Sequence, residues 1–227
     1  MDAAALIPLL LTLKVAAWAT LLATVAGVAA GALLAKFEFT GRDVVDAILL
    51  LPMVMPPTVL GYYLLVAFGR RSALGQWLEN TLGIELVFTW QGAVVAAAVV
   101  AFPLVFKAAR AAFEAVDPDL ERAGRTLGYT EATLFTRVTF PLAWRGIAAG
   151  AMLAFARAIG EFGATLMVAG NIPGRTQTMS IAIYEAVYAG DDALANRLVL
   201  ISSVVCVVML VAASGIIKRG RLRPQRL

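Results

Sequence analysis

The chain has 227 residues, of which 61% are hydrophobic and 15% are charged, and its mean hydropathy is +0.83. A soluble domain is about half apolar and about a quarter charged, so these proportions exclude an ordinary soluble fold and predict an integral membrane protein. There is no histidine and one cysteine, Cys206, which excludes an internal disulfide, a histidine base and a cysteine metal cluster. We therefore expect no catalytic, cofactor-binding or metal-binding residues. The net charge of +4 is typical of basic cytoplasmic loops rather than of nucleic-acid binding.

Five membrane-spanning helices are predicted, which makes this an all-α membrane protein with a single transmembrane domain over residues 1–227. Four of them are uncharged stretches of 20 to 23 residues: 15–35, 47–69, 86–106 and 198–217. At about 1.5 Å per residue, each covers a hydrocarbon core of roughly 30 Å. The fifth, residues 141–169, has a shorter uncharged centre because it carries Arg145, Arg157 and Glu161.

The distribution of positive charge predicts the orientation of these spans. Thirteen of the nineteen Lys and Arg residues lie in segments 36–46 and 107–145 and after residue 217. Because cytoplasmic loops are rich in Lys and Arg, these segments are expected inside, with the amino terminus outside and the carboxyl terminus in the cytoplasm. A sixth crossing by residues 176–189 would put the basic tail outside, so we expect that stretch to form an outer-surface or re-entrant helix.

Prolines interrupt two of the predicted spans: Pro52, Pro56 and Pro57 lie in the second, and Pro103 lies in the third. A proline removes a helical hydrogen bond and bends the helix, which membranes tolerate where neighbouring helices or water satisfy the freed carbonyls. The bend at Pro56 and Pro57 either lines or gates a path or serves helix packing, and the residues alone leave both open. The alanines and glycines of residues 25–32 predict close packing of the first helix.

Segment 110–140 is predicted to be a cytoplasmic loop with two short helices. Asp117 suits an N-cap, Pro118 suits the first helical position, and Gly128 suits a left-handed residue after the helix. An apolar stripe at helical spacing is expected on the first helix: Leu120, Gly124 and Leu127. Such a helix either docks into the groove of a partner protein or lies on the membrane surface, and the residues alone favour neither.

Arg157 and Glu161 are four residues apart, so their side chains can meet on one face of a helix. An ion pair inside a membrane is costly and is therefore a functional candidate. Either Arg157 briefly holds an anion, or the pair latches a gate, or the pair is a structural salt bridge near the outer surface.

The loop carries a family resemblance. Residues 121–128 and 138–141 resemble the EAA loop of bacterial ABC importer permeases, in which an acidic residue, small residues and a glycine precede an I-x-L-P sequence. This copy departs from that pattern. Arg122 and Gly124 stand where alanines are common, and Val138 and Phe140 replace isoleucine and leucine.

The resemblance is closest to the permeases of oxyanion importers, and among them to those for molybdate. The segments that carry it are 51–57, 69–71, 155–165 and 171–176, with sequences LPMVMPP, GRR, FARAIGEFGAT and NIPGRT. Permeases for tungstate and for sulfate or thiosulfate share the Arg157–Thr165 block, so these cargoes remain alternatives.

The resemblance implies a type I permease fold in the bacterial inner membrane and ATP-driven import of an oxyanion. The implied partners are a second copy of this chain, two copies of a cytoplasmic ATPase, and a periplasmic or tethered oxyanion-binding protein. The implied ATPase-coupling residues are Asp117, Leu120, Glu121, Arg122, Ala123, Arg125, Leu127 and Gly128, and the candidate pathway or gate residues are Arg157, Glu161, Pro56 and Pro57.

The chain has no nucleotide-binding motif of its own, so we expect a partner to hydrolyse ATP and this chain not to be an enzyme. A stand-alone secondary carrier is the alternative, but such carriers usually contain internal repeats, and no obvious repeat is visible here. A structural or assembly membrane protein would fit the hydropathy but not the combined motifs.

Overall fold

The computed structural model describes residues 3–221, and all the regular structure among them is helical. The elements are α1 (Ala3–Lys36), α2 (Arg42–Val54), α3 (Pro57–Phe68), α4 (Ala73–Leu82), α5 (Trp90–Glu114), α6 (Pro118–Thr126), α7 (Glu131–Leu134), the π-helical turn η1 (Phe135–Thr139), α8 (Phe140–Ile159), α9 (Gly163–Ala169), α10 (Met179–Tyr188) and α11 (Asp192–Arg221). The ends of the predicted single domain, and with them the tail cations Arg223 and Arg226, lie outside the described residues.

Four helical stretches are long and apolar enough to cross a membrane: α1, α5, the continuous run of α7, η1 and α8, and α11 up to Met209. The α2–α3 pair brings the number to five if it is one span, although the chain bends by 109° between its two helices. The predicted class, an all-α membrane protein with about five spans, is confirmed.

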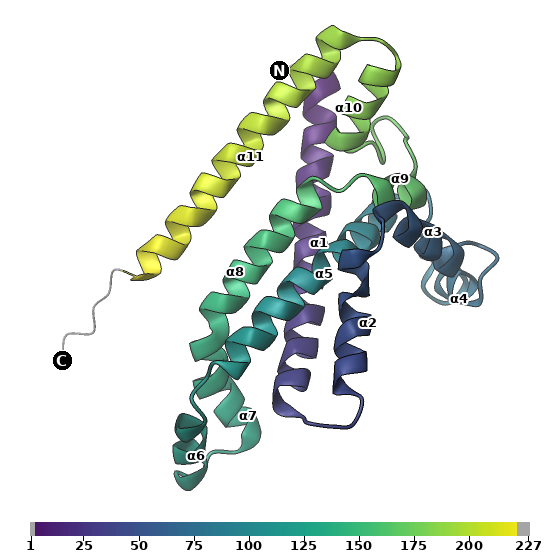
Figure 1. Cartoon of the computed structure of the whole chain (residues 1–227). Coiled ribbons are helices and arrows are strands. Elements are labelled where there is room, and N and C mark those ends of the chain that lie inside the picture. Colours follow the sequence, from purple (N-terminus) through teal and green to yellow (C-terminus); the bar gives the residue numbers. More distant parts are fainter. Residues whose placement is uncertain (1–2, 222–227) are drawn as a thin grey trace.

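Helices α1, α5 and α8 pack closely along the middle of the molecule (Figure 1). Gly27 of α1 touches α5 so closely that an added Cβ would lie 2.9 Å from the backbone nitrogen of Phe106. On α8, a Cβ at Gly150 would lie 2.5 Å from the Cβ of Ala108. Small residues let membrane helices approach to backbone contact, and the predicted close packing of the first helix is confirmed.

The second predicted span, residues 47–69, is two helices rather than one bent helix. Met55 is extended, with ψ 142°, and Pro57 stands at the start of α3. A proline disfavours helical backbone in the residue before it and suits the first turn of a new helix. Two successive prolines therefore end α2 and start α3, where a single proline would only have bent a continuous helix.

The fifth predicted span, residues 141–169, is also divided, into α8 and α9, with a break at residues 160–162. The next helix, α10, has ten residues, or about 15 Å, which is half the hydrocarbon thickness. It packs against the first part of α1 and the start of α11, where the backbone N–H of Met179 donates to the buried hydroxyl of Thr12 at 2.8 Å.

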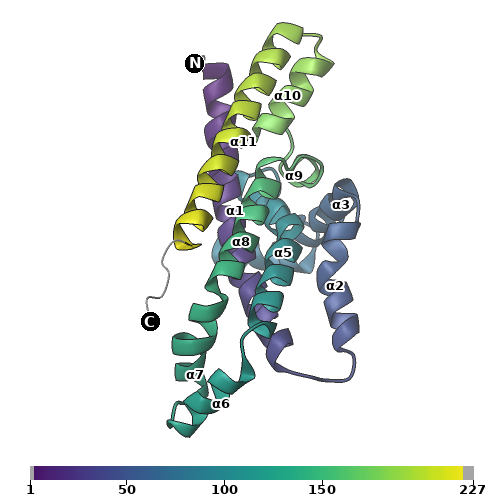
Figure 2. The same ribbon diagram turned by 60° about the vertical axis from the view of Figure 1, so that its left-hand side comes forward.

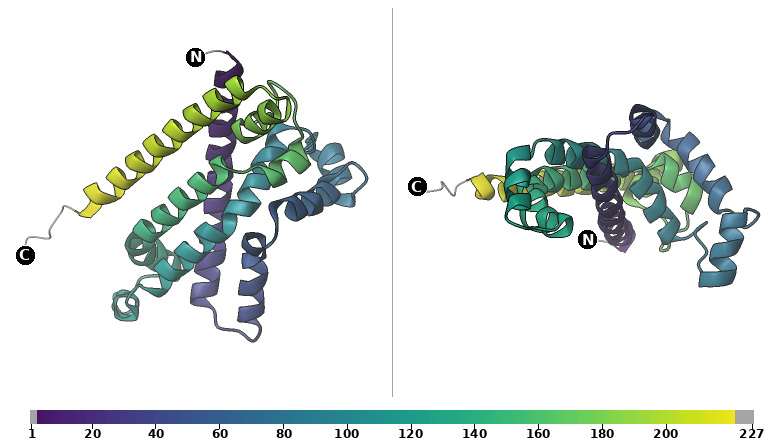
Figure 3. Two further views of the ribbon diagram at one scale, coloured as in Figure 1. Left: turned by 45° about the horizontal axis from the view of Figure 1, so that its top comes forward. Right: turned by 90° about the horizontal axis from the view of Figure 1, so that it is seen from below.

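The molecule has two unlike ends, seen best in Figures 1 and 2: α6 and α7 lie at one, and α10 lies at the other. Figure 3 shows α11 diverging from α8 toward its C-terminal end. A cavity of about 490 Å³ opens between α1, α8 and α11, and its lining includes Met152, Phe155 and Cys206.

Candidate functional site

The segment from Asp117 to Thr139, which we call the coupling element, comprises α6, α7 and η1 and projects from the end of the bundle (Figure 2). Its first helix begins and ends as predicted. The carboxylate of Asp117 accepts the backbone N–H of Asp119 at 2.9 Å, and Pro118 occupies the first turn. Gly128 has φ +81°, and the N–H groups of Gly128 and Tyr129 donate to carbonyls of the last turn, which is the Schellman arrangement.

The apolar stripe on α6 is only partly covered within the chain. Gly124 is buried, and a Cβ there would lie 2.5 Å from Cδ1 of Leu134 on α7. The glycine that departs from the family's usual alanine therefore lets α6 approach α7. Leu120 and Leu127 remain 48% and 75% exposed, so α6 keeps two apolar side chains available to a partner.

The charged residues of α6 divide into two groups. Arg122 pairs with Asp119 at 2.6 Å, and both side chains are exposed. Glu121 instead accepts a hydrogen bond from Thr139 of η1 at 2.8 Å and lies 3.6 Å from Arg125. These contacts fix the second group against the rest of the coupling element and leave the first group facing outward.

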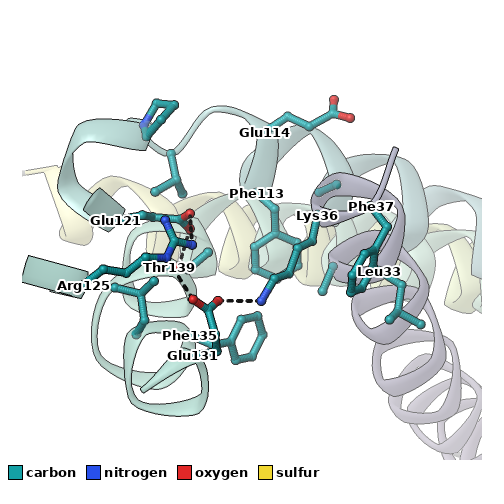
Figure 4. A pocket seen from close by; sticks show the side chains of 15 residues that line it. Leu33, Lys36, Phe37, Phe113, Glu114, Glu121, Arg125, Glu131, Phe135 and Thr139 are labelled. Carbon is teal, nitrogen blue, oxygen red and sulfur yellow. Dashed lines mark hydrogen bonds and ion pairs between the residues drawn. The ribbon is translucent and has the colours of Figure 1, made fainter. Parts of the chain in front are cut away.

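Arg125 also reaches α7, where its Nε donates to Glu131 at 2.8 Å. That hydrogen bond to the Glu131 carboxylate raises the pKa of Arg125 above its usual value, so the guanidinium stays charged. The other oxygen of Glu131 accepts Nζ of Lys36, at the end of α1, at 2.6 Å (Figure 4). Glu131 is not predictable from the sequence, because its partner on α1 lies 95 positions away and no local pattern marks it.

An open cavity of about 500 Å³ separates the coupling element from the ends of α1 and α5 (Figure 4). Its lining mixes apolar and charged side chains, which include Leu33, Phe113, Phe135, Lys36, Glu131 and Arg125. The coupling element is therefore linked to the end of α1 by the Lys36–Glu131 ion pair and to α5 by the Phe113–Phe135 ring contact, with 5.7 Å between the ring centroids.

A second charged cluster, also missed from the sequence, joins α2 to α5 at the same end. Arg110 pairs with both Asp46 and Glu114, and Arg42 pairs with Glu114 at 2.8 Å. In the sequence, Arg42 and Arg110 indicate only the orientation of the spans, and no local pattern marks Asp46 or Glu114. In the structure, they fix the start of α2 against the end of α5.

The predicted pair of Arg157 and Glu161 is formed, with 2.8 Å between Nη1 and Oε2. The contact is ionic, since its geometry is not that of a hydrogen bond. The Glu161 side chain is 2% exposed and that of Arg157 is 35% exposed. Glu161 stands in the break between α8 and α9, and its other oxygen accepts the N–H of Ala164 at 2.9 Å. A buried carboxylate needs such partners, so the pair fixes the break.

The two prolines lie close to this break. The structure packs α3 against α9, and a Cβ at Gly163 would lie 3.2 Å from Cβ of Pro57. Pro56, the N-cap of α3, is exposed. The structure thus brings the four predicted pathway or gate residues to one region, where two interrupted helices meet. Among the residues that the structure describes, no group of three or more Cys, Asp or Glu side chains is placed to hold a metal ion.

Comparison with known families defines the class of this protein. The family model described as "Binding-protein-dependent transport system inner membrane component" matches residues 23–221. The match covers most of the chain, so the chain belongs to this family of membrane-spanning permeases. It is a multi-pass inner-membrane protein and a component of a transport system.

Two relatives share most of their length with it. The chain is 43% identical over 218 residues to the molybdenum transport system permease protein ModB of Escherichia coli K12, covering 96% of this chain and 95% of that protein. It is 42% identical over 203 residues to the putative molybdenum transport system permease protein YvgM of Bacillus subtilis, covering 89% of each. The predicted resemblance to permeases of molybdate importers is confirmed.

Solved structures share the fold at lower identity. The MetNI methionine ABC transporter, in inward-facing conformations, aligns with a TM-score of 0.74 and 17% identity over 96% of this chain and 99% of that one. A bacterial ABC transporter that imports the acidic polysaccharide alginate aligns with a TM-score of 0.76 and 15% identity, over 96% of this chain and 80% of that one. The permease fold of ABC importers, expected from the loop motif, is confirmed.

Proposed function

We propose that this permease carries molybdate into the cell as part of an ATP-driven ABC importer. The proposal for the cargo is supported by the relatives at 42–43% identity, which are named as molybdenum transport permeases. Tungstate and sulfate or thiosulfate are the alternative cargoes, since all are tetrahedral or near-tetrahedral dianions.

The working assembly contains two copies of this chain, two copies of a cytoplasmic ATPase, and a periplasmic or tethered oxyanion-binding protein. About five helices are few to enclose a polar path for a dianion, and two copies about a two-fold axis enclose one between them. ATP hydrolysis belongs to the partner ATPase, and we assign no catalytic, metal or cofactor group to this chain. The α6–α7 end faces the cytoplasm, since the basic segments 36–46 and 107–145 lie toward that end of the bundle, and the amino terminus lies outside.

The observation that carries this mechanism is the exposed apolar surface on α6. Leu120 and Leu127 face solvent on a capped helix at the end of the bundle, where they fit a hydrophobic groove on the ATPase. Asp119 and Arg122 flank them with charges for the rim of that groove. Asp117 and Gly128 fix the two ends of the helix, and Glu121, Ala123 and Arg125 complete the docking segment.

The transport path passes the region of the two interrupted helices. Arg157 is partly exposed beside buried Glu161, so it can meet a dianion briefly while its neighbour limits how tightly that ion is held. Pro56 and Pro57 keep α2 and α3 as separate bodies around this region. When ATP draws the two ATPase subunits together, α6 moves with them, and the path switches from open inward to open outward.

The test is reconstitution of this permease in proteoliposomes with its ATPase and binding protein. We expect uptake of radiolabelled molybdate that requires ATP and the binding protein, and weaker uptake of sulfate. An ATPase subunit that binds but does not hydrolyse ATP is the matched control. Uptake that persists without the ATPase would instead favour a secondary carrier, and preference for tungstate or sulfate would reassign the cargo.

A further inference from the structure

Glu131 joins two parts of the chain that are distant in sequence. It is the first residue of α7, and one carboxylate oxygen accepts Nζ of Lys36 at 2.6 Å while the other accepts Nε of Arg125 at 2.8 Å. Lys36 ends α1 and Arg125 lies in the last turn of α6. Figure 4 shows the carboxylate between the two cations, with the cavity beside it.

Packing alone does not join α6 to the membrane-spanning bundle. Helix α6 contacts mainly α7 and η1, through Gly124 against Leu134 and through Glu121 to Thr139. The cavity of about 500 Å³ lies between this element and the ends of α1 and α5. A displacement of α6 reaches the bundle through the short link to α5 and through the continuous run of α7, η1 and α8. At the end of α1 itself, the direct side-chain link is the Glu131 carboxylate.

We propose that Glu131 is a positioning residue for transport, which holds the coupling helix α6 in register with the inner end of α1 across the cavity. This inference rests on the proposed function, because it assigns a role in passing the motion of the ATPase to the first span. Helix α1 is a suitable recipient, since Gly27 and Gly31 hold it in backbone contact with α5.

The contact acts on position rather than on folding. The side chains of Lys36 and Glu131 are each 53% exposed, and exposed ion pairs contribute little to stability because water and salt screen them. The chain therefore folds and inserts without the Glu131 charge, while α6 loses its fixed relation to α1. We therefore expect ATP hydrolysis to continue while fewer ions are transported per ATP.

The experiment uses the complete reconstituted complex with the variant Glu131→Gln. We expect the number of molybdate ions transported per ATP to fall by about two- to fivefold, the range that exposed ion pairs carry. Basal ATPase activity and co-purification of the ATPase should stay at the wild-type level. Glu38→Gln is the matched control: Glu38 is an exposed carboxylate beside the same helix end and makes no ion pair among the described residues, so transport per ATP should not change.

A double-mutant cycle separates this role from a local effect on α7. Lys36→Met breaks the Lys36–Glu131 contact alone and should lower transport per ATP, whereas Glu131→Gln also breaks the contact with Arg125. The double variant should fall no further than Glu131→Gln, because the Lys36 contact is already lost in that variant. Lys36→Arg keeps the charge and should retain most of the wild-type ratio. Additive losses in the double variant would overturn the inference.

Two failures remain distinguishable. A wild-type complex without ATP-dependent uptake would overturn the proposed function and this inference with it. A working wild-type complex in which Glu131→Gln transports as many ions per ATP as wild type would overturn this inference alone. Loss of the ATPase from the purified Glu131→Gln complex would also overturn it, since Glu131 would then serve docking.

Discussion

The packed bundle of α1, α5 and α8 and the coupling element at its end are held by different interactions. In the bundle, glycines bring backbones together, and fully buried alanines such as Ala97 and Ala109 fill the interior. In the coupling element, one glycine contact is supplemented by Glu121, Arg125 and Glu131, which are charged and partly exposed. The bundle should therefore be sensitive to added volume, and the coupling element to lost charge and altered backbone.

The largest effect is expected where volume is added to the bundle. Gly27→Leu would drive a side chain into the backbone of Phe106, and overpacking of this kind costs at least about 1–3 kcal/mol. We expect most of the folded permease to be lost, measured as monodisperse protein by size-exclusion chromatography in detergent. Ala29→Leu on the exposed side of α1 is the control and should leave the yield unchanged; equal losses in both would mean that α1 tolerates no added volume on either side.

The ion pair between Arg157 and Glu161 is the exception within the bundle. Arg157→Ala removes the partly exposed cation proposed to meet the dianion, while the Glu161 carboxylate keeps the N–H of Ala164 as a partner. We expect the uptake rate to fall by about tenfold, the effect of roughly 1.4 kcal/mol on a barrier, at a nearly normal yield of assembled complex. Arg157→Lys should retain more uptake than Arg157→Ala, and unchanged uptake kinetics in Arg157→Ala would remove this residue from the pathway.

A smaller effect is expected where volume is added to the coupling element. A leucine at position 124 would collide with Cδ1 of Leu134, which is the end of a flexible side chain. In Gly124→Leu, α6 can therefore move outward without unfolding the bundle. We expect weaker co-purification of the ATPase with a normal yield of permease. Gly124→Ala should have a lesser effect, because one methyl group requires only a small shift, and normal ATPase binding by Gly124→Leu would contradict the assigned docking segment.

The smallest effect is expected from a single hydrogen bond of the coupling element. Thr139→Val removes the donor to Glu121 while keeping the side-chain shape, and a neutral donor to a charged acceptor contributes about 1.5–3 kcal/mol at most. Because Glu121 retains Arg125 as a partner, we expect ATPase affinity to fall only about twofold to fivefold, as 0.5–1 kcal/mol implies. Titration of the ATPase against detergent-solubilised permease measures this affinity. A loss of affinity as large as that of Gly124→Leu would contradict the expectation that Thr139→Val has the smaller effect.

Features with local causes were predictable from the sequence. The uncharged stretches indicated the spans, because hydrocarbon thickness sets their length. Asp117, Pro118 and Gly128 gave the ends of α6, since helix caps depend on residues within one turn. The contact between Arg157 and Glu161 followed from their four-residue spacing.

Features that depend on distant partners were not predictable. In the sequence, nothing distinguishes Glu131 from any other exposed glutamate. Only the structure shows that Nζ of Lys36 lies 2.6 Å from its carboxylate. Arg42 and Arg110 indicated only positive charge in the sequence, whereas the structure pairs them with carboxylates of another helix or turn. The separation of α2 from α3 was underestimated, because the angle between them depends on how α3 packs against α9.

The divergence of α11 bears on the order in which the protein is made. Helices α1, α5 and α8 all precede α11 in the chain, so their mutual packing can be complete while α11 is still being synthesised. The last helix then joins by attaching its first turns to α10 and the start of α1, beside a bundle that already exists. Stop codons introduced near residue 192 should accordingly leave a membrane-inserted, protease-resistant fragment.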